Sequence, residues 1–275
     1  VELSRDDGQN WSVVPKAVSN SRTLTISGLA PGTKYDVRIS ASTTAGRSDY
    51  LTGSLTTATT FPSAPLLLEA TDLSTTTLLL RWQLPATNGG APITDYRVEF
   101  SSNSGAAWTA IGHEPSNTLS FRVTGLAKAK SYRFRVAAIN SQGAGTFSST
   151  VDATTLGDVP SAPQTFAANS ITTNSAQFTW VAPSDNGGTP VTGYVISTSR
   201  DSGTTWSELS PFGSQVRSAR LAGLAAGVRY DVRIVAVNAT GRSTEASVQV
   251  VTLPGVPAIV TGLRSSDLTG TTLTL

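Results

Sequence analysis

The sequence predicts an all-β chain built from tandem β-sandwiches, and three observations support this prediction. Marker residues recur at a step of 97 or 98 residues. Short segments alternate between large apolar and polar residues, and no apolar stripe with the 3.6-residue period of a helix is evident. A step of this length fits one small domain, and the alternation indicates strands with one buried and one solvated face. Each step is therefore expected to fold as two packed antiparallel sheets.

Three sets of residues define the repeat. The triplet Gly-Leu-Ala begins at Gly28, Gly125 and Gly223, so the two steps are 97 and 98 residues long. The same two steps separate the members of two aromatic sets, which are Trp11, Trp108 and Trp206, and Tyr35, Tyr132 and Tyr230. Because these independent markers share one register, the chain is expected to consist of repeated units of about this length.

Five segments alternate clearly and are expected to form strands. They are Tyr35–Ile39, Tyr96–Phe100, Leu119–Val123, Tyr132–Val136 and Tyr230–Ile234. Turn signals lie between such segments, at Asn88-Gly89-Gly90, Gly125 and Gly143. Glycine and asparagine accept the backbone angles that tight turns need, so short strands joined by turns are the expected organisation.

The composition excludes several classes of protein. The 275 residues are 39% hydrophobic and 14% charged, which is too apolar for a disordered chain. The net charge of +2 is too balanced to predict a partner that is a nucleic acid. With no Cys and one His, we expect no thiol chemistry, no metal, no cofactor and no enzyme activity. No run of 18 apolar residues occurs, so no membrane insertion is expected.

The single histidine, His113, lies in the sequence Gly112-His113-Glu114-Pro115 and is expected in a solvated loop. A general base needs a nucleophile and an orienting group, and a metal site needs more than one strong ligand. The sequence places neither arrangement beside His113, so we assign it no chemical role.

The markers occur in the same order in the second and third steps. The second step has Pro62–Pro65, Trp82, Tyr96, Gly125-Leu126, Tyr132 and Ala138-Ile139-Asn140, and the third has Pro160–Pro163, Trp180, Tyr194, Gly223-Leu224, Tyr230 and Ala236-Val237-Asn238. In this order they resemble the fibronectin type III domain, over the whole chain. The resemblance implies immunoglobulin-like sandwiches of seven strands, with sheet A-B-E packed on sheet C-C′-F-G. It also implies a tyrosine corner, in which a Tyr hydroxyl bonds to backbone near the E–F turn. Abundant Ser and Thr with little Lys favour a bacterial array of this type.

Alignment of the steps predicts four pieces. Residues 1–59 are a partial domain with strands C to G, residues 60–156 and 157–252 are complete domains, and residues 253–275 are a partial domain with strands A and B. One interpretation is that a long array has been cropped. The other is that residues 254–275 of one chain complete the open first domain of the next, which would build a head-to-tail filament by strand complementation.

A second motif falls between the predicted strands C and C′. Ser4–Trp11 and Ser199–Trp206 both read S-x-D-x-G-x-x-W, and Ser101–Trp108 has Asn in place of Asp. This resembles the Asp-box hairpin, which is structural in the proteins that carry it. The acidic or amide side chain can accept turn N–H groups, the Gly can adopt a positive φ, and the Trp can cover the hairpin. We therefore favour a structural hairpin over a sugar-binding site.

Arginines line the predicted outer face of strands C and F. Arg97 and Glu99 belong to one strand, and Arg133 and Arg135 belong to its neighbour. Cross-strand charge pairs keep an exposed sheet soluble, and we favour this interpretation. The alternative is a basic face that grips an acidic glycan through bidentate Arg contacts.

The F–G loops are the remaining candidates for a partner site. They are Thr43–Asp49, Asn140–Thr146 and Asn238–Glu245. Within them, the residues predicted to contact a partner are Arg47, Asp49, Gln142, Arg242 and Glu245. The resemblance implies that such loops carry partner contacts, although the integrin-binding tripeptide Arg-Gly-Asp is absent.

These features predict a non-catalytic segment of a secreted or cell-surface protein. Its expected role is to space, display or link, with a protein or glycan at the cell surface as partner. Two alternatives remain open: an accessory spacer of a secreted polysaccharide-degrading enzyme, and a filament or virion surface subunit that associates with itself through the terminal half-domains.

Overall fold

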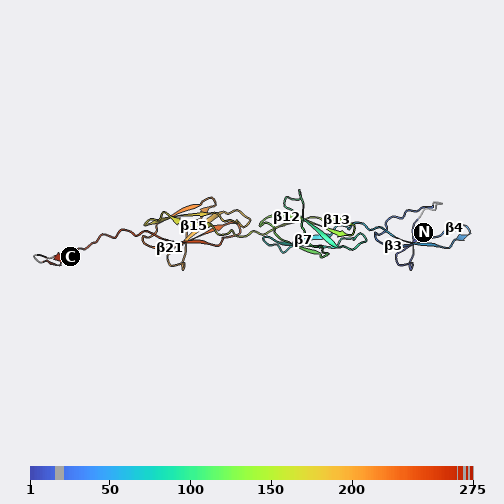
Figure 1. Ribbon diagram of the computed structural model, residues 1–275, viewed down its shortest axis with the longest axis horizontal. Helices are drawn as coiled ribbons and strands as arrows, with labels where there is room; N and C mark the ends of the chain where they lie inside the picture. The colour runs from blue at the N-terminus through green and yellow to red at the C-terminus, as the bar shows by residue number, and fades with distance from the viewer. Residues whose placement is uncertain (16–21, 265, 269–270, 272, 275) are drawn as a thin grey trace. The chain divides into compact units, whose positions relative to one another are not determined.

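All regular elements among the described residues of the computed structural model are β-strands (Figure 1). The structure describes residues 1–15, 22–264, 266–268, 271 and 273–274. The chain divides into two compact units, Val1–Leu156 and Gly157–Leu275. No helix in the described residues has the length and apolar character needed to cross a membrane.

The second repeat contains the two predicted sheets. One sheet has the order β11-β8-β7, formed by Ser120–Val123, Leu78–Gln83 and Leu66–Thr71. The other has the order β10-β9-β12-β13, formed by Thr109–Ala110, Asp95–Ser101, Ser131–Asn140 and Gly143–Phe147. A further segment, β14 (Val151–Thr154), also pairs with β12, so the seventh strand of the sandwich is formed in two parts. These orders are the E-B-A and C′-C-F-G arrangement implied by the resemblance.

Alternation along the strands places the core of this repeat. In β8, Leu78, Leu80 and Trp82 are buried, whereas Arg81 and Gln83 between and beyond them are exposed. Opposite them, Phe134 and Val136 on β12 are fully buried. The cluster that joins these side chains draws only on residues of this repeat. The sheets therefore close on one another, as a sandwich requires.

The third repeat has the same plan. Strands β15 (Gln164–Asn169), β16 (Ser175–Val181) and β20 (Ser218–Ala222) form one sheet. The other contains β18 (Ser207–Glu208), β17 (Gly193–Ser199), β21 (Arg229–Val237) and β22 (Ala246–Val251), with a short β19 (Phe212–Gly213) that also pairs with β17. Its core cluster, which includes Phe178 and Trp180, is separate from that of the second repeat.

The predicted tyrosine corner is present in all three repeats. The backbone N–H of Ala30, Ala127 and Ala225 donates to the hydroxyl of Tyr35, Tyr132 and Tyr230, at 2.9, 2.9 and 2.8 Å respectively. Each hydrogen bond ties the start of strand F to the loop five residues earlier, so the E–F turn has a fixed path.

The first repeat differs from the prediction in one strand. It contains β1 (Glu2–Ser4), β2 (Ser12–Val13), β3 (Lys34–Ile39), β4 (Ser42–Thr43), β5 (Gly46–Arg47) and β6 (Leu51–Thr56). The expected strand E is not formed: residues 22–27 are not in a strand. The equivalent strand β11 pairs only with β8, and no strand takes the place of β8 among the residues of 1–59 that the structure describes. Without that neighbour, the backbone groups of a strand have nothing to pair with.

Near the other end, β23 (Ser266–Leu268) pairs with β24 (Leu273–Thr274). These antiparallel segments lie where strands A and B are expected. Part of that prediction, including Leu275, lies outside the described residues.

One asparagine fixes the base of the F–G loop in the second repeat. The Asn140 side chain is 4% exposed, and its Nδ2 donates to the carbonyl oxygens of Thr60 and Asn88, each at 2.8 Å. Its Oδ1 accepts from the backbone N–H of Gln142 at 2.8 Å. Beside it, Gly89 has φ +73°, and a Cβ at that residue would lie 2.1 Å from the Thr60 oxygen. The start of the domain, the B–C loop and the F–G loop are therefore locked together.

Asn238 repeats this arrangement in the third repeat. It is 5% exposed and donates to the carbonyl oxygens of Asp158 and Asn186 at 2.7 and 2.8 Å. Its Oδ1 accepts from the backbone N–H of Thr240 at 2.9 Å. In both complete repeats, the loop predicted to meet a partner therefore begins from a rigid base.

Candidate functional site

The predicted loop residues of the first repeat are exposed. The guanidinium of Arg47 donates to the hydroxyl of Tyr50 at 2.8 Å and lies 4.0 Å from a carboxylate oxygen of Glu2. The carbonyl oxygen of Asp49 accepts from the Ser48 hydroxyl at 2.9 Å. Arg47 is thereby directed along the sheet surface rather than away from it.

The other three predicted residues are also exposed and also make contacts within the chain. Nε2 of Gln142 donates to Thr59 at 2.8 Å. In the third repeat, Arg242 pairs with Glu208, with an Nη2 to Oε2 distance of 3.2 Å, and Glu245 accepts from Arg233 at 3.0 Å. Arg242 and Glu245 lie between β21 and β22, in the F–G loop, and their ion pairs join this loop to strands C′ and F.

A stack of side chains on the outer face of the C′-C-F-G sheet was not predicted from the sequence. In each repeat, an Arg of strand F lies over the Trp of the C–C′ hairpin. The distances from the guanidinium carbon to the ring centroid are 4.3, 4.1 and 4.1 Å for Arg38 on Trp11, Arg135 on Trp108 and Arg233 on Trp206. At these distances a guanidinium is attracted to the aromatic face. The sequence signal that could have revealed this stack is the constant separation of 27 residues between the Trp and the Arg.

Each of these Arg side chains also contacts a residue of strand G or the loop before it. Arg38 also lies 4.3 Å from the Tyr50 ring, and Arg135 lies 4.0 Å from the Phe147 ring. In the third repeat the equivalent residue is Glu245, which forms the ion pair with Arg233. A predicted partner residue therefore occupies a position that is aromatic in the other two repeats.

Glu99 anchors this face in the second repeat. The residue is 3% exposed, and it accepts hydrogen bonds from Arg97 at 2.7 Å and from Arg135 at 2.6 and 2.8 Å. Charge-assisted pairs of this kind hold both partners in place. The arrangement supports the interpretation of these arginines as paired residues of a solvated sheet face.

The C–C′ hairpins share one hydrogen-bond pattern. In the third repeat, the Ser199 hydroxyl donates to Asp201 at 2.8 Å and accepts from the N–H of Gly203 at 2.9 Å. Asp201 accepts from the N–H of Thr205 at 2.8 Å, and the indole of Trp206 donates to the Gly203 oxygen at 3.0 Å. The first repeat has the same bonds around Asp6, and Asn103 accepts the equivalent N–H in the second. Each of these polar side chains thus serves to close its own hairpin.

These hydrogen bonds predict a pH response that differs between repeats. Bonds donated by the Thr205 side chain and backbone lower the pKa of Asp201 to about 2, and the N–H of Asn10 does the same for Asp6. Because the folded pKa is depressed, the hairpins are stabilised above the ordinary value of 3.8, and this stabilisation is lost as the pH falls towards 2.

NMR titration of the Asn10 and Thr205 amides should give midpoints near 2. The Ala107 amide, which is bonded to Asn103, is the internal control and should not titrate with them. A midpoint near 3.8 for Thr205 would show that the hairpin bonds are absent in solution.

His113 does not lie in open solvent as predicted. Its side chain is 16% exposed, and its ring packs on Phe121 with a centroid distance of 5.0 Å. The two ring nitrogens lie 2.8 and 2.9 Å from the carbonyl oxygens of Glu114 and Tyr96. The loop after β10 turns back over the sandwich edge, and these contacts hold the imidazole there. Within the described residues, no cluster of three His, Asp or Glu side chains could bind a metal.

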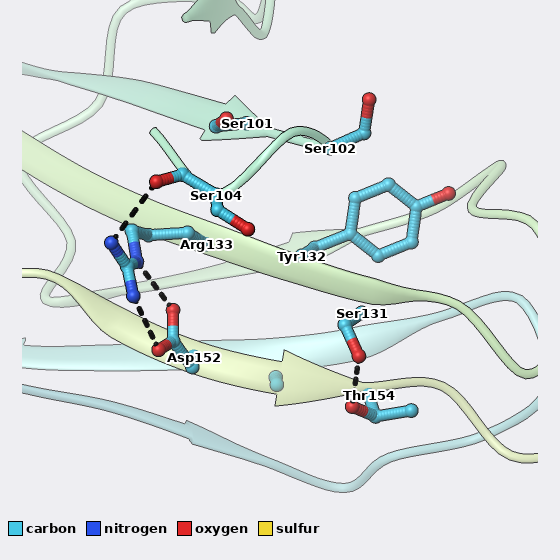
Figure 2. A pocket seen from close by; sticks show the side chains of 9 residues that line it. Ser101, Ser102, Ser104, Ser131, Tyr132, Arg133, Asp152 and Thr154 are labelled. Atoms are coloured by element: carbon cyan, nitrogen blue, oxygen red, sulfur yellow. Dashed lines mark hydrogen bonds and ion pairs between the residues drawn. The ribbon is translucent and has the colours of Figure 1, made fainter. Parts of the chain in front are cut away.

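A polar depression lies beside the hairpin of the second repeat (Figure 2). It has a volume of 320 Å³ and lies between residues 101–104, the start of β12 and β14. Arg133 donates to both carboxylate oxygens of Asp152, at 2.6 and 2.8 Å, and to the Ser104 carbonyl oxygen at 3.1 Å. The hydrogen bond from Arg133 lowers the pKa of Asp152. On the other side, the hydroxyls of Ser131 and Thr154 lie 2.7 Å apart.

Comparisons with known proteins agree with this fold. A family model described as "Fibronectin type III domain" matches residues 63–154 and 161–252. The chain is 31% identical to fibronectin type-III domain-containing protein 3a of Gallus gallus, over 84% of this chain and 19% of that protein. It is 27% identical to Myomesin-2 of Homo sapiens, over 86% of this chain and 17% of that protein. A solved two-domain fibronectin type-III segment from chicken tenascin has 27% identity and a TM-score of 0.41, covering 68% of this chain and 99% of that segment. The chain spans less than a fifth of either curated relative.

Proposed function

Because the chain belongs to the fibronectin type III family, we propose that it acts as a spacer and an adhesive array in a secreted or cell-surface protein. Relatives with the same repeats support the coarser conclusion that this is a non-catalytic structural repeat segment. One observation carries the proposal: each complete repeat closes its own apolar core. Separate cores allow each domain to fold as a unit and to resist force independently of its neighbour.

Stretching the chain tests the spacer role. We expect two unfolding events in single-molecule force spectroscopy, one for each complete repeat. Each should lengthen the chain by roughly 300 Å, because about 90 residues extend by about 3.5 Å each. A single event that releases both repeats together would contradict independent domains.

The adhesive role is assigned to the F–G loops, with a protein or a glycan as partner. Arg47, Gln142 and Arg242 are exposed, and the loop bases at Asn140 and Asn238 are buried and hydrogen-bonded. Exposed polar side chains on a rigid base lose little conformational freedom when they bind, which favours recognition.

Beads that carry the chain should adhere to surfaces coated with matrix proteins or polysaccharides. The triple variant Arg47→Ser, Gln142→Ala, Arg242→Ser should reduce this adhesion without changing the melting temperature. Arg122→Ser is the matched control, because Arg122 is exposed on β11 of the opposite sheet. Equal losses in the triple variant and the control would exclude the F–G loops as the contact surface.

Self-association is a second candidate, and one observation favours it. Ile39 is 46% exposed, whereas Val136, at the same position in the second repeat, is fully buried. In this proposal, strands near the end of one copy cover the apolar face of the first repeat of another. Sedimentation velocity should then show growth with concentration, and a monomer at every concentration would exclude it.

A further inference from the structure

A short side chain lines the depression in the second repeat, at a position where the other two repeats have a long cationic one. Ser131 is the first residue of β12, and the equivalent residues are Lys34 and Arg229. In the first repeat, Nζ of Lys34 reaches across to Asp7 in the C–C′ hairpin, at 2.7 Å. In the second repeat, Ser131 is too short to cross that space, and the 320 Å³ depression lies there instead. This surface therefore differs between repeats that otherwise share one plan.

The groups around the depression are almost all hydroxyls or members of one ion pair. Figure 2 shows Ser102, Ser104, Ser131 and Thr154 around it, with the Arg133–Asp152 pair on one side. Three of the five guanidinium N–H groups of Arg133 are used within the chain, which leaves two as donors. The carboxylate of Asp152 keeps further acceptor capacity, and its side chain is 64% exposed. Donors and acceptors therefore converge on a space that is large enough for one sugar ring.

We propose that this depression binds one residue of a neutral saccharide. The inference deepens the glycan half of the proposed function, on which it rests. Sugar hydroxyls both donate and accept, so they match the Ser and Thr hydroxyls and the planar edge of the Arg133–Asp152 pair. Such a shallow, polar contact gives dissociation constants on the order of 1 mM for one sugar, and an array raises the avidity through its neighbouring contacts.

The charges favour a neutral sugar over an acidic one. Arg133 and Asp152 cancel, and the exposed carboxylate of Asp152 would repel a sulfate or uronate brought against it. Arg97 and Arg135 on the same sheet are already bound to the buried Glu99. Those two cations are therefore committed to a carboxylate of this chain, and the ammonium of Lys130 lies over the Tyr132 ring, 5.7 Å from its centroid.

The test is an NMR titration of the intact 275-residue chain with methyl glycosides of glucose, galactose, mannose and N-acetylglucosamine. We expect saturable shifts at the amides of Ser102, Ser104, Ser131 and Thr154 with at least one glycoside. The equivalent amides of Arg5, Lys34, Arg200 and Arg229 should not shift. Heparin disaccharide is the acidic probe, and it should bind more weakly at this site. The proposal would be overturned if none of the neutral glycosides shifted the four amides at a concentration of about fifty times the expected dissociation constant.

Two substitutions take their residues from the other repeats, where the same fold accepts them. Ser131→Lys places the side chain of the first repeat across the depression, and Thr154→Val introduces the residue found at Val251. Each should weaken saccharide binding by about tenfold or more while the melting temperature stays unchanged. Ser149→Lys adds the same charge at an exposed serine outside the depression and should have no effect.

The same titration separates this inference from the proposed function. If Ser131→Lys and Ser149→Lys bind the saccharide equally, the site is not this depression. If adhesion through the F–G loops persists while no saccharide binds, only the present inference fails. If the unmodified chain showed neither adhesion nor saccharide binding, the glycan half of the proposed function would be contradicted as well.

Discussion

Replacing Phe134 with Ala is expected to lower the free energy of unfolding of the second repeat by ~3–5 kcal/mol and to leave the third repeat unchanged. Phe134 is fully buried in β12, opposite Phe100 in the cross-strand register. Its removal leaves a cavity that a packed sandwich can only partly fill. The third repeat is unaffected because its core cluster contains no residue of the second.

Calorimetry of the whole chain measures this effect, since each complete repeat should contribute its own transition. The transition of the second repeat should shift to lower temperature in Phe134→Ala, and Phe178→Ala should shift only that of the third repeat. Leu84→Ala is the control, because Leu84 is 58% exposed and its truncation should cost about 0.5 kcal/mol or less. Joint shifts of both transitions would mean that the repeats share one core.

The fold could be predicted because its main determinants recur along the chain. Trp82, Tyr132 and the alternation in Tyr132–Val136 each indicate that one side of a strand is buried. The same pattern recurs at a constant step along the chain. The absence of strand E from the first repeat could not be predicted in this way. Residues 23–26 alternate between polar and apolar side chains as β11 does, but a strand at a sheet edge forms only against a neighbour, and β11 depends on β8 for this.

The candidate sites were less predictable because they depend on pairing between distant residues. The sequence predicts that Arg242 and Glu245 lie in the F–G loop, but it does not show that they pair with Glu208 and Arg233. The depression is harder still to find in the sequence. The depression lies beside the short Ser131 side chain, and its other walls are the C–C′ hairpin and β14. Those walls come together only in the folded domain. His113 looked solvated because its packing partner, Phe121, belongs to another strand.

Asn140→Asp is expected to lower the free energy of unfolding of the second repeat by roughly 2–4 kcal/mol. The wild-type Nδ2 donates to two carbonyl oxygens, Thr60 O and Asn88 O, in a buried site. A carboxylate has no donor to offer there, so an anionic oxygen would face two carbonyl oxygens at close range. Asn140→Ala removes the hydrogen bonds without adding this repulsion, and about 1–3 kcal/mol is expected for it.

Urea denaturation across a pH series distinguishes the two effects. Repulsion and burial should raise the pKa of the new carboxyl above the ordinary value of about 3.9. The deficit of Asn140→Asp should therefore be full at neutral pH and shrink as the pH falls through that raised pKa, since a protonated acid regains a donor. The deficit of Asn140→Ala should stay constant over the same range. If Asn140→Asp were as stable as the wild type at pH 7, the Nδ2 donor would contribute nothing, and the rigid base assigned to the F–G loop would have to be abandoned.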